Sequence, residues 1–219
     1  MLFIFDMGGV VTSTFPLDAL CARLGLTSDD FFAITRMNGD NIWHKLETGK
    51  ITTADFWSSF NTRVGMLQRT LYDGILKTED LLTLSPGSDI QEVPQVRHDL
   101  FRLYFHPRLD SQTAALISDL RRKHRVVCGT NTIQSHWENH LERGDYALFD
   151  QTYASNKIGA AKPGADFFNL ILEAENCAPQ DAFFTDDRNE NCEAAGKIGI
   201  SAVRFTSAAD LRKIWEEYL

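Results

Sequence analysis

Acidic and hydroxyl side chains stand directly after three short apolar segments of this 219-residue chain. Asp6 follows the first segment, Thr130 follows the second, and Asp186 with Asp187 follows the third. A carboxylate can attack a phosphorus atom or hold a divalent cation, and a hydroxyl can donate a hydrogen bond to a phosphate oxygen. An isolated Asp6 fits a simple turn equally well, so the inference rests on the recurrence. Three apolar segments that are each followed by such a side chain indicate a catalytic or binding site.

The segments before these side chains have the length and composition of strands buried on both faces, which is typical of parallel sheets. They span 2–5, 125–129 and 182–185, and two further strands are expected over 151–154 and 200–205. Segments with helical spacing alternate with them, which predicts right-handed crossovers. The expected fold class is α/β, with a Rossmann-like parallel sheet. In such a sheet, the carboxyl ends of the strands form the ligand-binding edge.

Residues 13–105 show helical spacing throughout and contain no convincing strand. Ser28 and Thr52 are expected to cap two of the helices there, and others are predicted over 66–77 and 93–105. The predicted domains are therefore a core over 1–12 and 106–219 and an inserted all-helical cap over 13–105.

Composition and charge exclude several classes of function. The formal net charge of -8 argues against nucleic acid and anionic membranes as partners. No segment has the roughly 18 to 20 consecutive apolar residues of a membrane helix, and the opening apolar run is too short for a signal peptide. The cysteines show no metal-binding or redox spacing, which predicts free thiols and a cytoplasmic protein. The pattern does not define an oligomeric state.

These side chains are suited to phosphoryl transfer. Asp6 can take a phosphoryl group as an aspartyl-phosphate, and Asp186 with Asp187 can hold the Mg²⁺ that offsets the repulsion between carboxylate and phosphate. Lys162 offers a further cation, although a lysine before proline is more often a solvated loop residue. Asp187 has an alternative role as the cap of a helix that starts at 189.

Four segments resemble, in order and spacing, the motifs of the haloacid dehalogenase-like hydrolase superfamily. They are Asp-Met-Gly-Gly-Val, Gly-Thr-Asn-Thr, Ala-Lys-Pro and Phe-Thr-Asp-Asp-Arg-Asn-Glu-Asn. The helical insertion after the first motif resembles the helical cap of that superfamily. Short stretches, among them Trp-His-Lys-Leu-Glu-Thr-Gly-Lys-Ile-Thr, are similar to bacterial sugar-phosphate phosphatases that act on glucose 1-phosphate.

The resemblance implies a role for each matching residue. Asp6 would be the nucleophile, Thr130 the phosphate-binding hydroxyl and Lys162 the stabilising cation. Asn131 would lie with Thr130 among the phosphate-binding groups at the start of a helix. The metal ligands would be Asp6, the Gly8 carbonyl, Asp186 and Asp187. The implied cofactor is Mg²⁺, and the implied partner is a small phosphorylated metabolite.

Gly8 departs from the pattern, because most phosphatases of the superfamily have a second Asp there as general acid and base. Losing such a group costs about 10² to 10⁴ in rate. Three interpretations stay open: a leaving group that needs little help, such as the anomeric oxygen of a sugar 1-phosphate; an acid from the cap, with His44 and Glu47 as candidates; or a protein that binds phosphoryl compounds and turns them over poorly.

A phosphatase is thus the leading hypothesis, and a haloacid dehalogenase or a non-catalytic binding protein are its alternatives. A dehalogenase would also use Asp6 but would have no need for the Asp186 and Asp187 pair, since displacement of halide from carbon requires no magnesium. His136 and His140 lie four apart on a predicted helix, where a solvated face is the simpler interpretation and a shared metal the alternative.

Overall fold

The computed structural model describes residues 1–72, 85 and 89–218. The chain separates into two compact units: Met1–Phe15, Glu47–Gly49 and His106–Leu219 form the core unit, and Pro16–Leu46 with Lys50–Phe105 form the helical unit. The short segment Glu47–Gly49 groups with the core unit, whereas the sequence analysis had included it in the cap. That the two units are independent domains stays a prediction.

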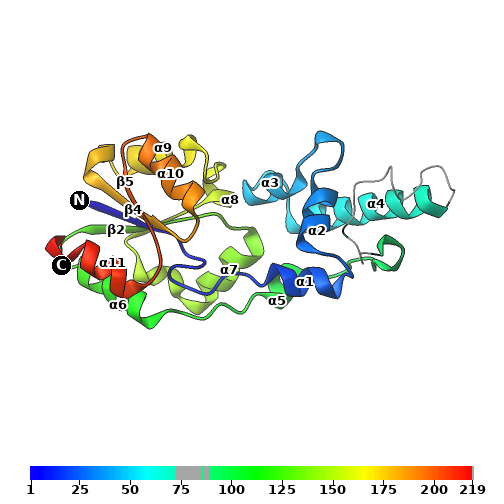
Figure 1. Cartoon of the computed structure of the whole chain (residues 1–219), viewed down its shortest axis with the longest axis horizontal. Helices are drawn as coiled ribbons and strands as arrows, with labels where there is room; N and C mark the ends of the chain where they lie inside the picture. The colour runs from blue at the N-terminus through cyan, green and yellow to red at the C-terminus, as the bar shows by residue number, and fades with distance from the viewer. Residues whose placement is uncertain (73–84, 86–88, 219) are drawn as a thin grey trace. The chain divides into compact units, whose positions relative to one another are not determined.

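The core unit contains a five-stranded parallel sheet in the order β3-β2-β1-β4-β5, which confirms the predicted α/β fold (Figure 1). The strands are β1 Leu2–Phe5, β2 Arg125–Thr130, β3 Gln151–Ala154, β4 Ala182–Asp186 and β5 Ser201–Arg204. β1 is central. Its last residue, Phe5, pairs with Cys128 of β2 and Thr185 of β4. The residue after it, Asp6, is therefore level with the carboxyl ends of both neighbours.

Helices cover both faces of this sheet (Figure 1). They are α6 Ser111–Leu120, α7 Gln134–Arg143, α8 Ser155–Ile158, α9 Ala165–Ala174, α10 Asn189–Lys197 and α11 Ala208–Ile214. Because side chains alternate along a strand, Phe3 and Phe5 enter one apolar cluster, with residues of α6 and α11, and Ile4 enters another, with residues of α9 and α10. Burial on both faces explains why β1 is apolar at every position.

The helical unit holds an aromatic core. Its helices are α1 Leu17–Arg23, α2 Ser28–Thr35, α3 Ile42–Glu47, α4 Thr53–Tyr72 and α5 Leu100–Tyr104, with short 3₁₀ turns at Met37–Gly39 and Ile90–Glu92. Rings from all but the first helix interlock, for example Trp57 stacked on Phe101 with centroids 4.5 Å apart. Phe31, Phe56 and Phe60 are completely buried beside them.

Several predicted helix boundaries in this unit were wrong. Thr27 caps α2, one residue before the expected Ser28, through a reciprocal contact with Asp30. One long helix, α4, replaces the two predicted from Thr52 and over 66–77; the last part of that prediction lies outside the described residues. The helix predicted over 93–105 begins only at Leu100, because Asp99 caps it there.

The two chain segments that flank the helical unit pair with each other at the core. The Ser13 amide donates to the Arg108 carbonyl (2.9 Å), and the Asp110 amide donates to the Val11 carbonyl (2.9 Å). Thr12 forms an antiparallel bridge with Leu109. The chain thus leaves and re-enters the core along neighbouring paths.

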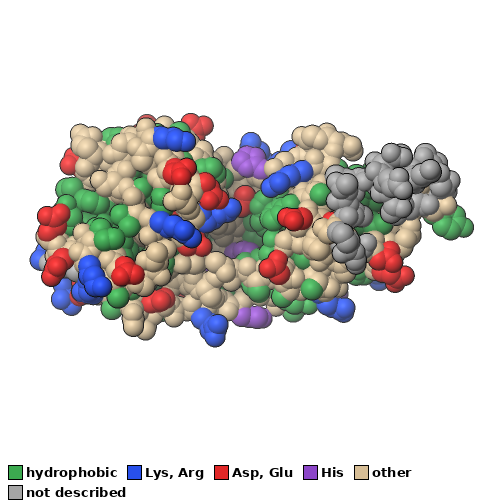
Figure 2. Space-filling view, in the orientation of Figure 1, with side chains coloured by type: hydrophobic (Ala, Val, Ile, Leu, Met, Phe, Trp, Pro, Cys, Tyr) green, Lys and Arg blue, Asp and Glu red, His purple; other side chains and the backbone are tan. Residues whose placement is uncertain are grey.

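Acidic and basic side chains are interspersed on the face of the core unit seen in Figure 2. Some of them form ion pairs, including Arg212 with Asp119 (2.7 Å) and Arg121 with Asp150 (2.8 Å). Within the described residues, no helix is long and apolar enough to cross a membrane.

Candidate active site

Asp6 lies at the carboxyl end of the central strand and is 8% exposed. Its amide donates to the Thr185 carbonyl (3.0 Å), which continues the pairing with β4. The chain then turns back on itself: the amides of Val11 and Thr12 both donate to the Met7 carbonyl, at 2.9 and 2.8 Å. This tight loop holds Asp6 at the edge of the sheet.

Lys162 lies between two carboxylates. Its Nζ is 2.8 Å from Asp6 Oδ1 and 2.6 Å from Asp186 Oδ2, and its side chain is 1% exposed. Burial raises the pKa of Asp6 to about 6, although the Lys162 ammonium opposes that shift. Burial alone would lower the pKa of Lys162, but Asp6 and Asp186 outweigh it, so that this pKa is raised. Lys162 is therefore a fixed ammonium and not the solvated loop residue of the alternative interpretation.

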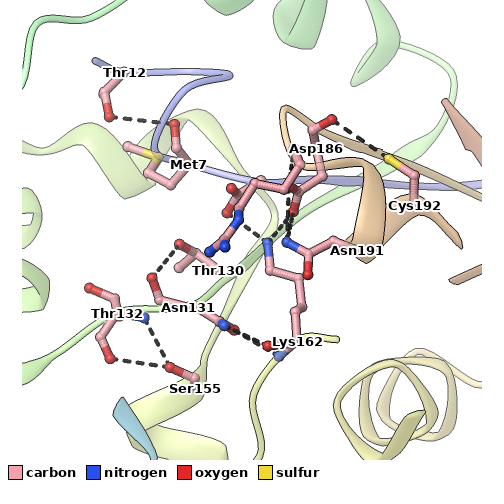
Figure 3. A network of polar contacts seen from close by, with 12 residues as sticks. Met7, Thr12, Thr130, Asn131, Thr132, Ser155, Lys162, Asp186, Asn191 and Cys192 are labelled. Carbon is pink, nitrogen blue, oxygen red and sulfur yellow. Dashed lines mark hydrogen bonds and ion pairs between the residues drawn. The ribbon is translucent and has the colours of Figure 1, made fainter. Parts of the chain in front are cut away.

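Asp186 is completely buried and accepts hydrogen bonds at both oxygens (Figure 3). Besides Lys162, its donors are Asn191 Nδ2, 3.0 Å from each oxygen, and the Arg188 amide at 2.9 Å. Asn191 was not among the site residues predicted from the sequence. An amide five residues after an acid, within the first turn of the next helix, is the signal that could have found it.

Asp187 differs from Asp186 in having its carboxylate packed against the first loop. A Cβ added to Gly9 would lie 2.5 Å from Asp187 Oδ2, and Gly9 has a φ of +85°, so that glycine permits the close approach. Burial and the neighbouring Asp186 raise the pKa of Asp187. The alternative role as a helix cap was wrong, because α10 begins after Arg188 and has no side-chain cap.

One group of potential metal ligands appears among the described residues: oxygens of Asp6, Asp186 and Asp187 all lie within 4.8 Å of one another. Among the described residues, the Lys162 ammonium contacts two of these three carboxylates, those of Asp6 and Asp186. The excess negative charge and the oxygen donors suit a hard divalent cation such as Mg²⁺. Asp186 already has its oxygens occupied by donors, which leaves Asp6 and Asp187 as the carboxylates best able to bind it.

Thr130 is the last residue of β2, which extends one residue further than predicted, and Asn131 follows it. Thr130 is 3% exposed, and its hydroxyl makes one long contact, 3.4 Å, with the Asn131 carbonyl. The Asn131 side chain contacts the backbone of Lys162 twice: Nδ2 donates to the carbonyl (2.8 Å), and Oδ1 accepts from the amide (2.8 Å). Asn131 thereby fixes the segment that carries the ammonium (Figure 3). Its predicted contact with phosphate stays a prediction.

A second pair of hydrogen bonds fixes the loop that follows β2. The Thr132 amide donates to Ser155 Oγ (2.9 Å), and that hydroxyl donates to the Thr132 carbonyl (3.1 Å). Both residues are buried. The ends of β2 and β3 are thus joined beside the site.

The remaining candidates lie elsewhere in the chain. His44 is exposed on α3, where its amide donates to Asn41 Oδ1 (3.0 Å), and it belongs to the helical unit. Glu47 ends α3 and groups with the core unit. A substrate contact for either side chain stays a prediction.

His136 and His140 do not form the solvated face that their spacing suggested. They are 9% and 3% exposed, and His140 Nδ1 lies 2.8 Å from Asp145 Oδ2. Burial lowers the pKa of His140. In the described chain, neither histidine belongs to a group of three or more potential metal ligands.

Comparison with known proteins agrees with this geometry. The family model of haloacid dehalogenase-like hydrolases matches residues 1–199. The sesquiterpene phosphatase astK of Aspergillus oryzae is 24% identical over 207 residues, which are 94% of this chain and 89% of that protein.

Among solved structures, the HAD family enzyme BT-2542 of Bacteroides thetaiotaomicron has a TM-score of 0.68 at 21% identity, with 97% of each chain covered. Its complex with magnesium and inorganic phosphate has a TM-score of 0.65 at 21% identity, over 94% of this chain and 93% of that one. The similarity to glucose 1-phosphate phosphatases stays a prediction. With its motifs, its fold and a family match over most of its length, the chain belongs to the haloacid dehalogenase-like hydrolases.

Proposed function

We propose that the protein is a magnesium-dependent phosphomonoester hydrolase that acts on a small phosphorylated metabolite through an aspartyl-phosphate on Asp6. The observation that carries this proposal is the buried Lys162 ammonium, 2.8 Å from Asp6 and 2.6 Å from Asp186, with Asp187 completing a set of three carboxylates. A dianionic phosphoryl group can approach Asp6 only where positive charge offsets the repulsion.

In the first step, a carboxylate oxygen of Asp6 forms a bond to phosphorus while the ester P–O bond breaks. Lys162 keeps Asp6 oriented and places positive charge beside the transferring group. The Thr130 hydroxyl, with no short contact of its own, is available to donate to a phosphoryl oxygen. Water then attacks the phosphorus of the aspartyl-phosphate, which releases inorganic phosphate and restores Asp6.

Asp6, Asp187 and the Gly8 carbonyl would hold the magnesium ion, while Asp186 is kept in place by Lys162, Asn191 and the Arg188 amide. When bound, the ion supplies positive charge against the phosphoryl oxygens and the attacking carboxylate. A neighbour of this fold that binds magnesium and inorganic phosphate, and a relative named as a phosphatase, support the proposal. A sugar phosphate such as glucose 1-phosphate is one candidate substrate.

We also propose a cytoplasmic location. The cysteines of the chain, Cys21, Cys128, Cys177 and Cys192, are all free thiols, which is typical of a reducing compartment.

The test is phosphate release from a panel of phosphomonoesters, including glucose 1-phosphate, by wild type, Asp6→Asn and Asp181→Asn. Asp181 is an exposed aspartate before β4, at the opposite edge of the sheet from Asp6, and serves as the matched control. We expect release that requires Mg²⁺, is abolished in Asp6→Asn and is unchanged in Asp181→Asn. Hydrolysis of a haloacid that survives chelation would point instead to a dehalogenase. Phosphate binding without turnover would point to a binding protein.

A further inference from the structure

The space beside Gly8 is open. Apart from its chain neighbours Met7 and Gly9, a Cβ added to Gly8 would meet no atom of the described core unit within 4 Å, and the backbone there lies outside the left-handed region. Gly9 is the opposite case, because its φ and the Asp187 carboxylate both demand glycine. The chain therefore lacks a side chain at position 8 although its geometry would accept one, two residues after the nucleophile.

The charged groups of the candidate site are already engaged. Lys162 is held between two carboxylates, and Asp186 accepts from Lys162, Asn191 and the Arg188 amide. Asp187 belongs to the proposed metal set. Proton transfer to a leaving oxygen needs an acid within hydrogen-bond reach. Among the described residues of the core unit, none occupies the position that a side chain at residue 8 would take.

We propose that position 8 restricts this enzyme to phosphoryl compounds whose leaving oxygen departs as an unprotonated, stable anion, such as aryl or enol phosphates and sugars phosphorylated at the anomeric oxygen. This rests on the phosphatase function proposed above. An Asp6 oxygen bonds to phosphorus, the P–O bond breaks, and both electrons of that bond stay on the departing oxygen. That oxygen takes its proton from water after it has left the site.

This mechanism makes the first step sensitive to the acidity of the leaving alcohol. Without an acid, the leaving oxygen carries its full developing charge in the transition state, and an alkyl phosphate loses the roughly 10² to 10⁴ in rate that an acid supplies. Hydrolysis of the aspartyl-phosphate is common to all substrates. The value of kcat/KM reports the first step and should therefore depend on the acidity of the leaving alcohol. The value of kcat can be the same for several substrates.

The experiment measures kcat/KM, at fixed Mg²⁺, for phenyl phosphates with graded ring substituents and for an alkyl phosphate. Wild type is compared with Gly8→Asp and with Gly8→Asn, which has the same shape as the aspartate but no carboxyl proton. We expect a steep fall of kcat/KM with decreasing leaving-group acidity in wild type and in Gly8→Asn. Gly8→Asp should flatten that fall: the ratio of kcat/KM on the alkyl phosphate to kcat/KM on the most acidic phenyl phosphate should rise by about 10² to 10⁴.

A flat series in the wild type would overturn this inference, because it requires an acid from another part of the chain. Equal behaviour of Gly8→Asp and Gly8→Asn would overturn it as well. If neither variant folds, the slope of the wild-type series alone decides. The proposed function fails separately: in that case no phosphomonoester is hydrolysed in a way that depends on Mg²⁺ and Asp6, whatever its leaving group.

Discussion

Four ionisable side chains meet where β1 and β4 end, and their charges do not balance. Asp6, Asp186 and Asp187 contribute three carboxylates within 4.8 Å, and Lys162 contributes one ammonium. Burial prevents water from screening the excess charge. Without a metal ion, the folded protein therefore carries an electrostatic cost at this site, as expected where residues are selected for chemistry more than for stability.

Replacing Asp6 by Asn should stabilise the metal-free protein at neutral pH. Burial raises the pKa of Asp6 from 3.8 to about 6 on folding. The folded state thus keeps a proton that the unfolded state releases, and the free energy of unfolding falls as pH rises from about 4 to 6, by at most about 3 kcal/mol. Asp6→Asn removes this dependence.

Urea unfolding at pH 4.5 and 7.5, without metal, measures the effect. Asp181→Asn is the control, since that side chain is exposed. An equal pH dependence in wild type and Asp6→Asn would contradict the assignment.

Replacing Lys162 by Met should have the opposite effect on stability. The methionine keeps most of the apolar volume, but Asp6 and Asp186 lose the cation between them. Breaking a buried pair in this way costs about 3 to 5 kcal/mol. We expect a lower melting temperature, partly restored by Mg²⁺, and loss of turnover. Lys197→Met, at an exposed lysine near the end of α10, is the matched control for thermal unfolding with and without the ion.

We expect Asn131 to act as a positioning residue, so that its removal affects kcat more than KM. Asn131→Ala removes two hydrogen bonds of 2.8 Å that hold the backbone of Lys162. Leaving those backbone groups unpaired costs about 1 to 3 kcal/mol, and Lys162 loses its fixed placement beside Asp6. Steady-state kinetics of this variant, beside Asn189→Ala on the exposed start of α10, measure the split. A change confined to KM would instead favour a direct substrate contact.

At the scale of elements, the strands were predictable from the sequence because burial on both faces leaves a continuous apolar run. β1 and β3 have the predicted bounds, and β2 and β4 each extend one residue further. The helix boundaries of the helical unit were less predictable. Tyr72 ends a helix that runs through Gly65 without a break, since aromatic packing outweighs the propensity of one glycine.

The residues of the candidate site that lie at the ends of strands were predictable from the sequence. Asp6, Thr130, Asp186 and Asp187 directly follow or end strands, and Lys162 emerged only from its place between them and from the resemblance. Ser155 was missed, because its contact with Thr132 joins the ends of two strands, which no local pattern contains. Asn191 was missed although its spacing from Asp186 is a local signal. Burial of His136 and His140 was missed for a related reason: their helix packs through polar contacts, such as that of His140 with Asp145.

Close packing around β2 predicts the effect of one added methyl group. A Cβ at Gly129 would lie 2.9 Å from Ile4 Cγ2, in β1, and 3.2 Å from Ile171 Cδ1, in α9, and both side chains are completely buried. Gly129→Ala should therefore destabilise the protein by about 1 to 3 kcal/mol. Gly196→Ala, on α10 with open space around it, should be neutral or slightly stabilising. Equal melting temperatures for the two variants would contradict the packing argument.

At the scale of the whole molecule, magnesium should act as a stabilising ligand. An ion that binds only the folded state adds about 2.7 kcal/mol at a concentration a hundred times its Kd. The donors Lys162, Asn191 and the Arg188 amide bind the carboxylate of Asp186 and not that of Asp187. Asp187 is therefore the better metal ligand, and Asp187→Asn should abolish the rise in melting temperature on adding Mg²⁺. Differential scanning fluorimetry of wild type, Asp187→Asn and Asp181→Asn measures it, and an unchanged rise in Asp187→Asn would exclude that residue as a ligand.

The central position of β1 has a consequence for how the protein is made. Within the described parts of the chain, β1 pairs with β2 and β4, which are synthesised about 120 and 180 residues later. At ribosomal rates of about 5 to 20 residues per second, β2 follows after roughly 6 to 25 s. Until then, Leu2–Phe5 has no partner for its backbone or its apolar side chains. The strand that precedes the proposed nucleophile Asp6 is thus a segment of the nascent chain that a chaperone would protect.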